Sequence, residues 1–113
     1  MSPITTHILD LSRGSPAEGV AVTLEQHRDG EWHLLGQRKT DADGRIRDLL
    51  ADDAALAAGG YRLAFDVASY FQKQSRETFY PTVTLCFSVK NPSEHYHVPL
   101  LLSPFGYSTY RGS

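Results

Sequence analysis

Alternation of apolar and polar side chains with a period of two is the feature that most constrains what this chain can fold into. The segment Thr82–Val89 reads TVTLCFSV, with valine, leucine and phenylalanine on one face and small polar residues on the other. Successive side chains of a β-strand point to opposite faces, so this segment is predicted to be a strand with one buried face. Residues 20–25 and 61–67 alternate in the same way. The three segments together predict an antiparallel sheet protein.

The remaining chain predicts further short strands joined by turns. Turn residues such as Asp-Gly, Gly-Gly and Asn-Pro separate four more candidate strands, and seven or eight strands at this spacing are typical of a β-sandwich. With 113 residues, one domain spanning 1–113 is expected. Two segments break the alternation, Ala51–Ala58 and Ser69–Glu77, and each is predicted to contain a turn or two of helix. The four further strands are predicted at Ile4–Leu9, Glu31–Gln37, His95–Leu102 and Tyr107–Tyr110.

Composition and charge exclude several classes of protein. Eleven basic against thirteen acidic residues give a formal charge of −2, without the basic cluster of a nucleic-acid binder. No stretch approaches the ~20 apolar residues that cross a bilayer, so no membrane partner is expected. The start, MSPITTHILD, has neither a basic region nor an apolar signal core, and a lone Cys86 cannot form an internal disulfide. We therefore expect a cytoplasmic protein.

The segment His95–Leu102 predicts an interface between subunits. Its alternation puts Tyr96, Val98, Leu100 and Leu102 on an apolar face and His95, His97, Pro99 and Leu101 on the other. If the first face packs in the core, the second carries apolar side chains outward, where an oligomer would cover them. Proline cannot donate a ladder hydrogen bond, so position 99 is expected at an edge, a bulge or an unpaired place.

Histidine is the side chain best suited to acid–base chemistry near neutral pH, and the chain has five. His27 and His33 flank an Asp-Gly turn and are predicted to lie at a solvated hairpin end. His7 sits within an apolar strand, and its residue type and position fit either a structural or a catalytic role. His95 and His97 share a strand face, where they could bind zinc with His7 as third ligand, or act as acid and base without metal.

Arg45 and the C-terminal segment supply further candidates. Arg45 follows a turn, Asp41–Gly44, whose spacing does not fit a calcium loop, and its guanidinium suits a planar anion or carbonyl edge. The alternative is an ordinary surface ion pair with Asp43 or Asp48. At the C-terminus, aromatic residues indicate a docked tail, in which Tyr110 either packs at an interface or, with Ser113, hydrogen-bonds a polar ligand.

Three segments carry a resemblance to a known family. THILDLSRGSPAEGVAVTLE, TDADGRI and HYHVPLLLSPFGYSTYRGS resemble the 5-hydroxyisourate hydrolases, the transthyretin-related proteins of purine catabolism, over essentially the whole chain. The terminal Tyr-Arg-Gly-Ser is typical of the hydrolases rather than the hormone-carrying transthyretins. The resemblance implies an all-β, transthyretin-like sandwich of two four-stranded sheets with one short helix, assembled as a homotetramer.

The resemblance also implies roles for particular residues. His7, Arg45 and His97 would be catalytic, and Tyr110 and Ser113 would join His7 and Arg45 in binding the substrate, 5-hydroxyisourate, in a pocket between subunits. His95 falls outside the catalytic set, and neither a metal nor a cofactor is implied. Water would attack the C6 carbonyl and break its bond to N1, giving 2-oxo-4-hydroxy-4-carboxy-5-ureidoimidazoline. The competing hypothesis is a carrier that binds a small aromatic ligand without chemistry.

Overall fold

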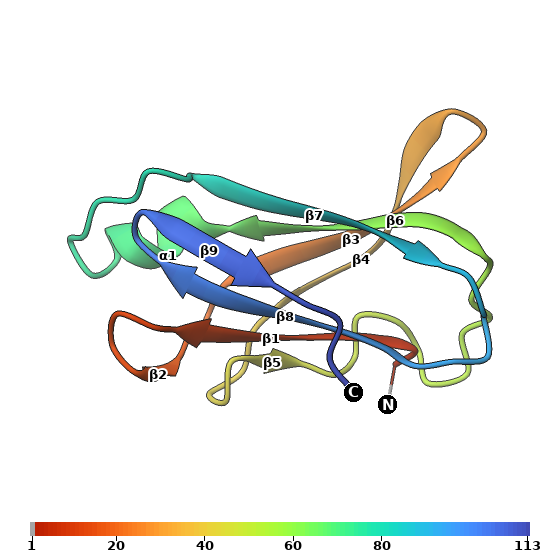
Figure 1. Cartoon of the computed structure of the whole chain (residues 1–113), viewed down its shortest axis with the longest axis horizontal. Helices are drawn as coiled ribbons and strands as arrows, with labels where there is room; N and C mark the ends of the chain where they lie inside the picture. Colours follow the sequence, from red (N-terminus) through yellow and green to blue (C-terminus); the bar gives the residue numbers. More distant parts are fainter. Residues whose placement is uncertain (1) are drawn as a thin grey trace.

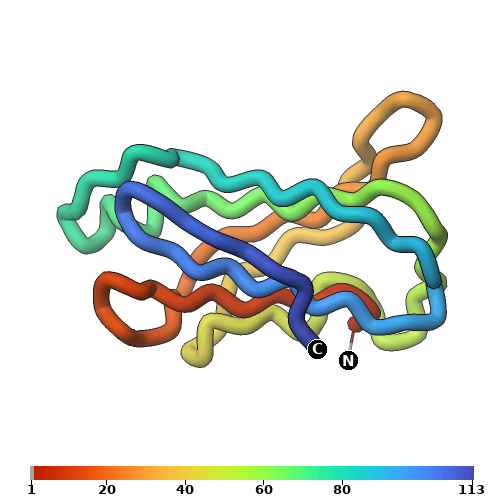
Figure 2. Tube along the Cα trace, in the orientation of Figure 1, coloured from red at the N-terminus to blue at the C-terminus, as the bar shows by residue number. Residues whose placement is uncertain are grey.

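Two β-sheets face one another across an apolar core in the computed structural model, which describes residues 2–113 (Figures 1 and 2). One short helix lies at one end of the sandwich, and the C-terminal tail runs back along the sheet that contains the N-terminal strand. The elements are β1 (Ile4–Asp10), β2 (Ser15–Pro16), β3 (Ala21–Arg28), β4 (Glu31–Lys39), β5 (Arg45–Ile46), β6 (Gly59–Asp66), α1 (Val67–Gln72), β7 (Thr82–Val89), β8 (Tyr96–Ser103) and β9 (Gly106–Thr109).

The sheets differ slightly from the expected two sets of four. One has the order β4-β3-β6-β7, and the other has the order β2-β1-β8-β9, with β5 also paired to β1. The two-residue strand β5, which pairs with β1 outside that order, is the fifth strand of its sheet. All pairs are antiparallel except β1 and β8, which run parallel from Ile4 opposite Tyr96 to Asp10 opposite Leu102. The antiparallel sheet predicted from the three alternating segments is confirmed in β3, β6 and β7. The parallel β1–β8 pair was not predicted, because alternation indicates the face of a side chain and not the direction of the neighbouring strand.

The predicted alternation is confirmed in the core. In β7, Val83, Leu85 and Val89 are buried while the intervening polar side chains are exposed, and Phe87 packs half-buried against the core. The strand has the predicted bounds. The sandwich therefore follows from the period-two pattern, and the outward faces are left for function.

The helix α1 begins earlier than predicted. Asp66 ends β6 and caps the helix by accepting a hydrogen bond from the Ser69 backbone N–H, so Val67 opens the helix instead of continuing the strand. The helix ends at Gln72, and Ser75, with φ at 55°, turns the chain away. Within residues 2–113 no helix has the length and apolar character to cross a membrane.

The helix predicted at Ala51–Ala58 was wrong. This segment forms a turn, with the Ala54 N–H donating to the Ala51 carbonyl, followed by irregular chain. Its side chains are mostly exposed, and Leu56 alone packs against the core. Alanine propensity cannot stabilise so short a helix without an apolar face to bury.

Pro99 departs from the expectation that its face stays uncovered in one subunit. It is buried, because the C-terminal tail crosses it at Gly112, while Leu101 is half-buried. Strand β8 is interior to its sheet, so Pro99 is not at an edge. On the β9 side it lies between the His97–Gly112 bridge and the first β8–β9 pair, Leu100 with Thr109, where the ladder has a gap that a proline tolerates. On the other side it is paired with His7 of β1.

Candidate active site

Neighbouring strands of one sheet bring three of the predicted residues together on its outer face. His7 lies opposite Arg45 in the β1–β5 pair, and Thr5 lies opposite His97 in the β1–β8 pair. Because side chains two apart on a strand share a face, Thr5 and His7 point to the same side as their partners. Residues 7, 45 and 97 thus converge although they are far apart in the chain.

Arg45 is positioned by the turn before it. The Asp41 carboxylate accepts hydrogen bonds from the backbone N–H groups of Asp43 and Arg45, both at 2.9 Å. Gly44 has φ at 73°, and a Cβ there would lie 2.4 Å from the Ile8 carbonyl oxygen, so the tight approach to β1 requires glycine.

Within the described residues 2–113, the guanidinium of Arg45 has no ion-pair partner. Asp48 lies 3.5 Å from Arg38, Asp41 lies 3.1 Å from Arg47, and no carboxylate among residues 2–113 pairs with Arg45 itself. The alternative of a surface ion pair with Asp43 or Asp48 is not what this structure shows. Arg45 is half-buried, and its donors are free for a ligand.

The imidazole of His97 is held by a hydroxyl group. Thr5 Oγ1 lies 2.8 Å from His97 Nδ1 and 2.9 Å from His95 Nε2. Thr5 is buried, His97 half-buried and His95 exposed. The hydrogen bond occupies Nδ1 and leaves Nε2 as the ring nitrogen of His97 available to a substrate or water.

Burial and positive charge lower the pKa of both imidazoles in this group. For His97 the main cause is burial, followed by Arg45 and the neighbouring histidines. For His7 burial again comes first and Arg45 second, partly opposed by a backbone hydrogen bond with Asp43. Both rings are therefore neutral at neutral pH, the state in which an imidazole accepts a proton.

The C-terminal tail closes one side of this group. The Gly112 N–H donates to the His97 carbonyl at 2.8 Å, and a Cβ on Gly112 would lie 2.6 Å from His97 Cδ2. Arg111 stacks on the Tyr96 ring, 4.3 Å from its centroid, and donates to the His95 carbonyl at 3.2 Å. These contacts place the terminal Ser113 beside His97.

A small cleft of about 130 Å³ results, and most of its lining is polar or charged. Three of its members, Thr5, Thr6 and Arg47, were missed at the level of the sequence. Thr5 could have been predicted, since it lies two residues from His7 and therefore on the same face of the strand. Arg47 lies two residues from Arg45 and could have been predicted in the same way. The lining residues are Thr5, Thr6, Arg45, Arg47, His95, His97 and Ser113.

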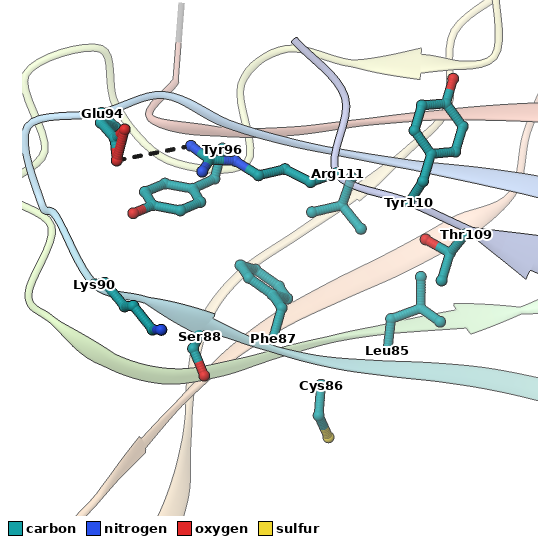
Figure 3. Close-up of a pocket in the computed structure, with 11 residues that line it drawn as sticks. Leu85, Cys86, Phe87, Ser88, Lys90, Glu94, Tyr96, Thr109, Tyr110 and Arg111 are labelled. Carbon is teal, nitrogen blue, oxygen red and sulfur yellow. Dashed lines mark ion pairs between the residues drawn. The ribbon is translucent and has the colours of Figure 1, made fainter.

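Tyr110 lies elsewhere in the subunit. It lines a larger groove of about 530 Å³ between β7 and the tail, together with Leu85, Phe87 and Tyr96. Figure 3 shows its ring pointing away from the other side chains of the groove, while Arg111 extends along Tyr96 toward Glu94. A single subunit thus places Arg45, His97 and Ser113 around the cleft, with His7 opposite Arg45 on the neighbouring strand. Tyr110 lines the other groove, and its contribution to substrate binding stays a prediction.

The other predictions for histidines concern the hairpin of His27 and His33 and a zinc site with His95. The predicted hairpin of His27 and His33 is present between β3 and β4, where the exposed His27 packs on Trp32 and His33 contacts the Arg28 carbonyl. Across residues 2–113, no three His, Cys, Asp or Glu side chains are arranged to hold a metal ion. The zinc ligand set considered for His7, His95 and His97 is therefore not formed.

Fold and site together define a β-sandwich protein with a polar cleft that holds the neutral imidazole of His97 and the guanidinium of Arg45, which has no ion-pair partner within residues 2–113. The sequence model described as the HIUase/Transthyretin family matches residues 4–112. This chain belongs to that family.

Individual relatives include 5-hydroxyisourate hydrolases and a transthyretin. A 5-hydroxyisourate hydrolase from Caulobacter vibrioides is 49% identical over 118 aligned residues, covering all of both chains. The solved 5-hydroxyisourate hydrolase of Klebsiella pneumoniae is 42% identical with a TM-score of 0.83, covering 97% of this chain and 98% of that one. Sea bream transthyretin, solved in complex with thyroxine, is 35% identical with a TM-score of 0.89, covering 97% and 94%. The backbone is thus common to both activities, and the side chains must separate them.

Proposed function

We propose that this protein is an enzyme that hydrolyses 5-hydroxyisourate in urate degradation. The observation that carries the proposal is a polar cleft lined by Arg45, His97 and the terminal Ser113, with His7 next to it on the paired strand opposite Arg45. Curated relatives that cover nearly the whole chain at 49% identity bear the name 5-hydroxyisourate hydrolase. The chemistry of the cleft fits the hydrolysis of an activated cyclic amide.

In the proposed mechanism a neutral imidazole activates water. His97 Nε2 takes a proton as the water oxygen bonds to C6, His7 helps to position that water, and Arg45 donates to the oxygen that gains negative charge. The C6–N1 bond then breaks with N1 as the leaving atom, the His97 imidazolium returns its proton to N1, and C6 remains as a carboxylic acid that releases its proton to solvent. Every group in this scheme belongs to the protein, and no metal or cofactor takes part.

The second candidate is a carrier of a small aromatic ligand, favoured by the likeness to a transthyretin solved with thyroxine. The two functions would use different surfaces. The groove lined by Leu85 and Phe87 suits an aromatic molecule, whereas the cleft of His97 and Arg45 is polar and suits a heterocycle rich in carbonyl groups. We favour the enzyme because an unpaired, half-buried arginine beside neutral imidazoles has no use in an apolar carrier.

We further propose that the cleft is completed by a second subunit in a cytoplasmic homotetramer. Strands β7 and β9 are unpaired edges of the two sheets, and Phe105 and Tyr107 are exposed beside them. Such edges and aromatic side chains are normally covered by another chain. The lone exposed thiol of Cys86 suits a reducing compartment.

The decay of freshly made 5-hydroxyisourate, followed by ultraviolet absorbance, tests the proposal. Added protein should accelerate the decay, and exhaustive chelation should leave the acceleration unchanged. Arg45→Ala should remove most of it while the tetramer, measured by light scattering, persists. Decay at the spontaneous rate with wild-type protein would favour the carrier, and loss of activity on chelation would favour a zinc hydrolase.

A further inference from the structure

The Thr5 hydroxyl lies between two imidazoles that come from the other end of the chain. Its oxygen is 2.8 Å from His97 Nδ1 and 2.9 Å from His95 Nε2. Thr5 is only 3% exposed, and the parallel pairing of β1 with β8 places it directly opposite His97. Solvent therefore has little access to the hydroxyl, and these two rings are its hydrogen-bond partners.

The single proton of the Thr5 hydroxyl restricts where the protons of the His95 and His97 rings can lie. Thr5 can donate only one hydrogen bond, so the two imidazoles cannot both accept, and one of them must present an N–H. Since the two rings are the partners of the hydroxyl, Thr5 donates its proton to one of them and accepts from the other: either His97 Nδ1–H donates to Thr5 and Thr5 donates to His95, or the direction of both bonds is reversed. The first arrangement leaves a lone pair on Nε2 of neutral His97, and the second places the proton there.

The function of the cleft selects the first arrangement. A general base needs a free lone pair on the atom that faces water, and Nδ1 of His97 is already engaged. The hydrogen bond at one ring nitrogen determines which nitrogen carries the proton. We propose that Thr5, supported by His95, is a positioning residue that keeps the proton of His97 on Nδ1 and so makes Nε2 the basic atom. This inference rests on the hydrolase function proposed above.

The position of His95 is itself fixed by neighbouring contacts. It directly precedes β8, and its carbonyl accepts a hydrogen bond from Arg111 at 3.2 Å. Arg111 in turn stacks on Tyr96 and lies 3.9 Å from the Glu94 carboxylate. The tail that delivers Ser113 to the cleft therefore also holds the residue that accepts from Thr5.

Replacing Thr5 separates the hydroxyl from the bulk of the side chain. Thr5→Val keeps the shape and removes the hydroxyl, and we expect kcat to fall about 10- to 100-fold, the scale seen when an orienting hydrogen bond is lost, with little change in KM. Thr5→Ser retains the hydroxyl and should restore most of kcat. His95→Leu should lower kcat, whereas His95→Gln, whose side-chain oxygen can still accept, should retain more of it.

A matched control and a second readout separate positioning from stability. Thr40 is a buried threonine whose hydroxyl bonds to Val20 and Ala17 away from the cleft, so Thr40→Val should lower stability and leave kcat unchanged. Nitrogen chemical shifts of the His97 ring, measured by NMR on the wild-type protein, should show Nδ1 protonated and Nε2 unprotonated. Wild-type kcat in Thr5→Val, or a proton on Nε2 in that spectrum, would overturn the inference. The NMR spectrum reports the tautomer of His97 whether or not the protein is an enzyme. If the proposed hydrolysis is wrong, the wild-type protein will not accelerate the decay of 5-hydroxyisourate, and this result is independent of the spectrum.

Discussion

Two imidazoles with lowered pKa beside an arginine make the activity depend on pH in a definite direction. Burial first and Arg45 second hold the pKa of His97 below its ordinary value of about 6.5. The unprotonated base is therefore present at neutral pH and is lost as the pH falls through the lowered pKa. We expect kcat/KM for 5-hydroxyisourate to be level near pH 7 and to decline only below about pH 6.5.

His97→Asn provides the comparison for this profile. Loss of the general base should lower kcat by about 10²- to 10⁴-fold and remove the contribution of His97 to the acid limb. His33→Asn, at the distant β3–β4 hairpin, should leave the profile unchanged. An acid limb that begins well above pH 6.5 would contradict the neutral state assigned to these rings.

Gly112 allows the tail to lie flat against His97. A Cβ there would be 2.6 Å from His97 Cδ2 and 3.2 Å from Pro99 Cγ, so Gly112→Ala must displace the tail or the ring. Displacement of about 1 Å can cost up to ~100-fold in rate, and we expect a loss of that order in kcat/KM with the fold retained. Gly106→Ala, where a Cβ meets no atom within 4 Å, serves as the control, and equal activity in the two variants would show that the tail does not position the site.

Residue types and the resemblance were enough to nominate His7, Arg45, His97 and Ser113. The structure places Arg45, His97 and Ser113 around one cleft and His7 opposite Arg45 on the paired strand. Residue types and the resemblance were not enough to find the hydrogen bonds of Thr5, because those depend on the parallel pairing of strands some 90 residues apart. Nor did spacing indicate that the tail would bury Pro99. Contacts of this kind follow from the assembled sheet and not from local pattern.

At the scale of elements, a buried carboxylate ties α1 to β1. Asp10 is fully buried at the end of β1 and accepts from Tyr70 at 2.8 Å and from Arg76 at 3.2 Å, and Ser12 also donates to it. Burial alone would raise the pKa of Asp10, but these donors outweigh it and hold the pKa below its ordinary value. The ionised carboxylate therefore stabilises the junction of strand and helix.

Asp10→Asn tests this junction. Removing one partner of a buried charge pair costs about 3 kcal/mol or more, so the free energy of unfolding in urea should fall by about that amount. Because the pKa of Asp10 is lowered by folding, its stabilisation of the wild-type protein is complete above about pH 4 and is lost as the pH falls through the pKa of the folded state. The free energy of unfolding of the variant should therefore depend less on pH in the acid range.

Asp48→Asn is the matched control for that measurement. Asp48 pairs with Arg38 on the surface at 3.5 Å. Exposed ion pairs contribute little to stability, so the free energy of unfolding should change only slightly. Equal effects in Asp10→Asn and Asp48→Asn would show that the buried carboxylate does not stabilise the contact between β1 and α1.

Elements with clear alternation were predictable and the others were not. Strand β7 has the predicted bounds because one face must be buried, which fixes the period. The alanine-rich segment 51–58 failed because its composition favours a helix while its exposure gives the helix nothing to pack against. The alternation also did not predict the direction of neighbouring strands, as the parallel β1–β8 pair shows.

At the scale of the whole molecule, two surface pockets distinguish the two proposed functions. The backbone resembles both a 5-hydroxyisourate hydrolase and a transthyretin, so fold alone does not separate catalysis from transport. The larger groove lies between β7 and the tail, and the smaller cleft lies beside His97. Which of them takes a planar heterocycle decides between the two accounts.

A crystal structure of the protein with a bound purine analogue tests the central claim most directly. Our account predicts the analogue in the polar cleft, with its carbonyl edge on the Arg45 guanidinium and both the His7 and His97 rings in contact with it. A second subunit should close the cleft from the outside. An analogue bound only in the groove of Leu85 and Phe87, out of reach of these three side chains, would contradict the account.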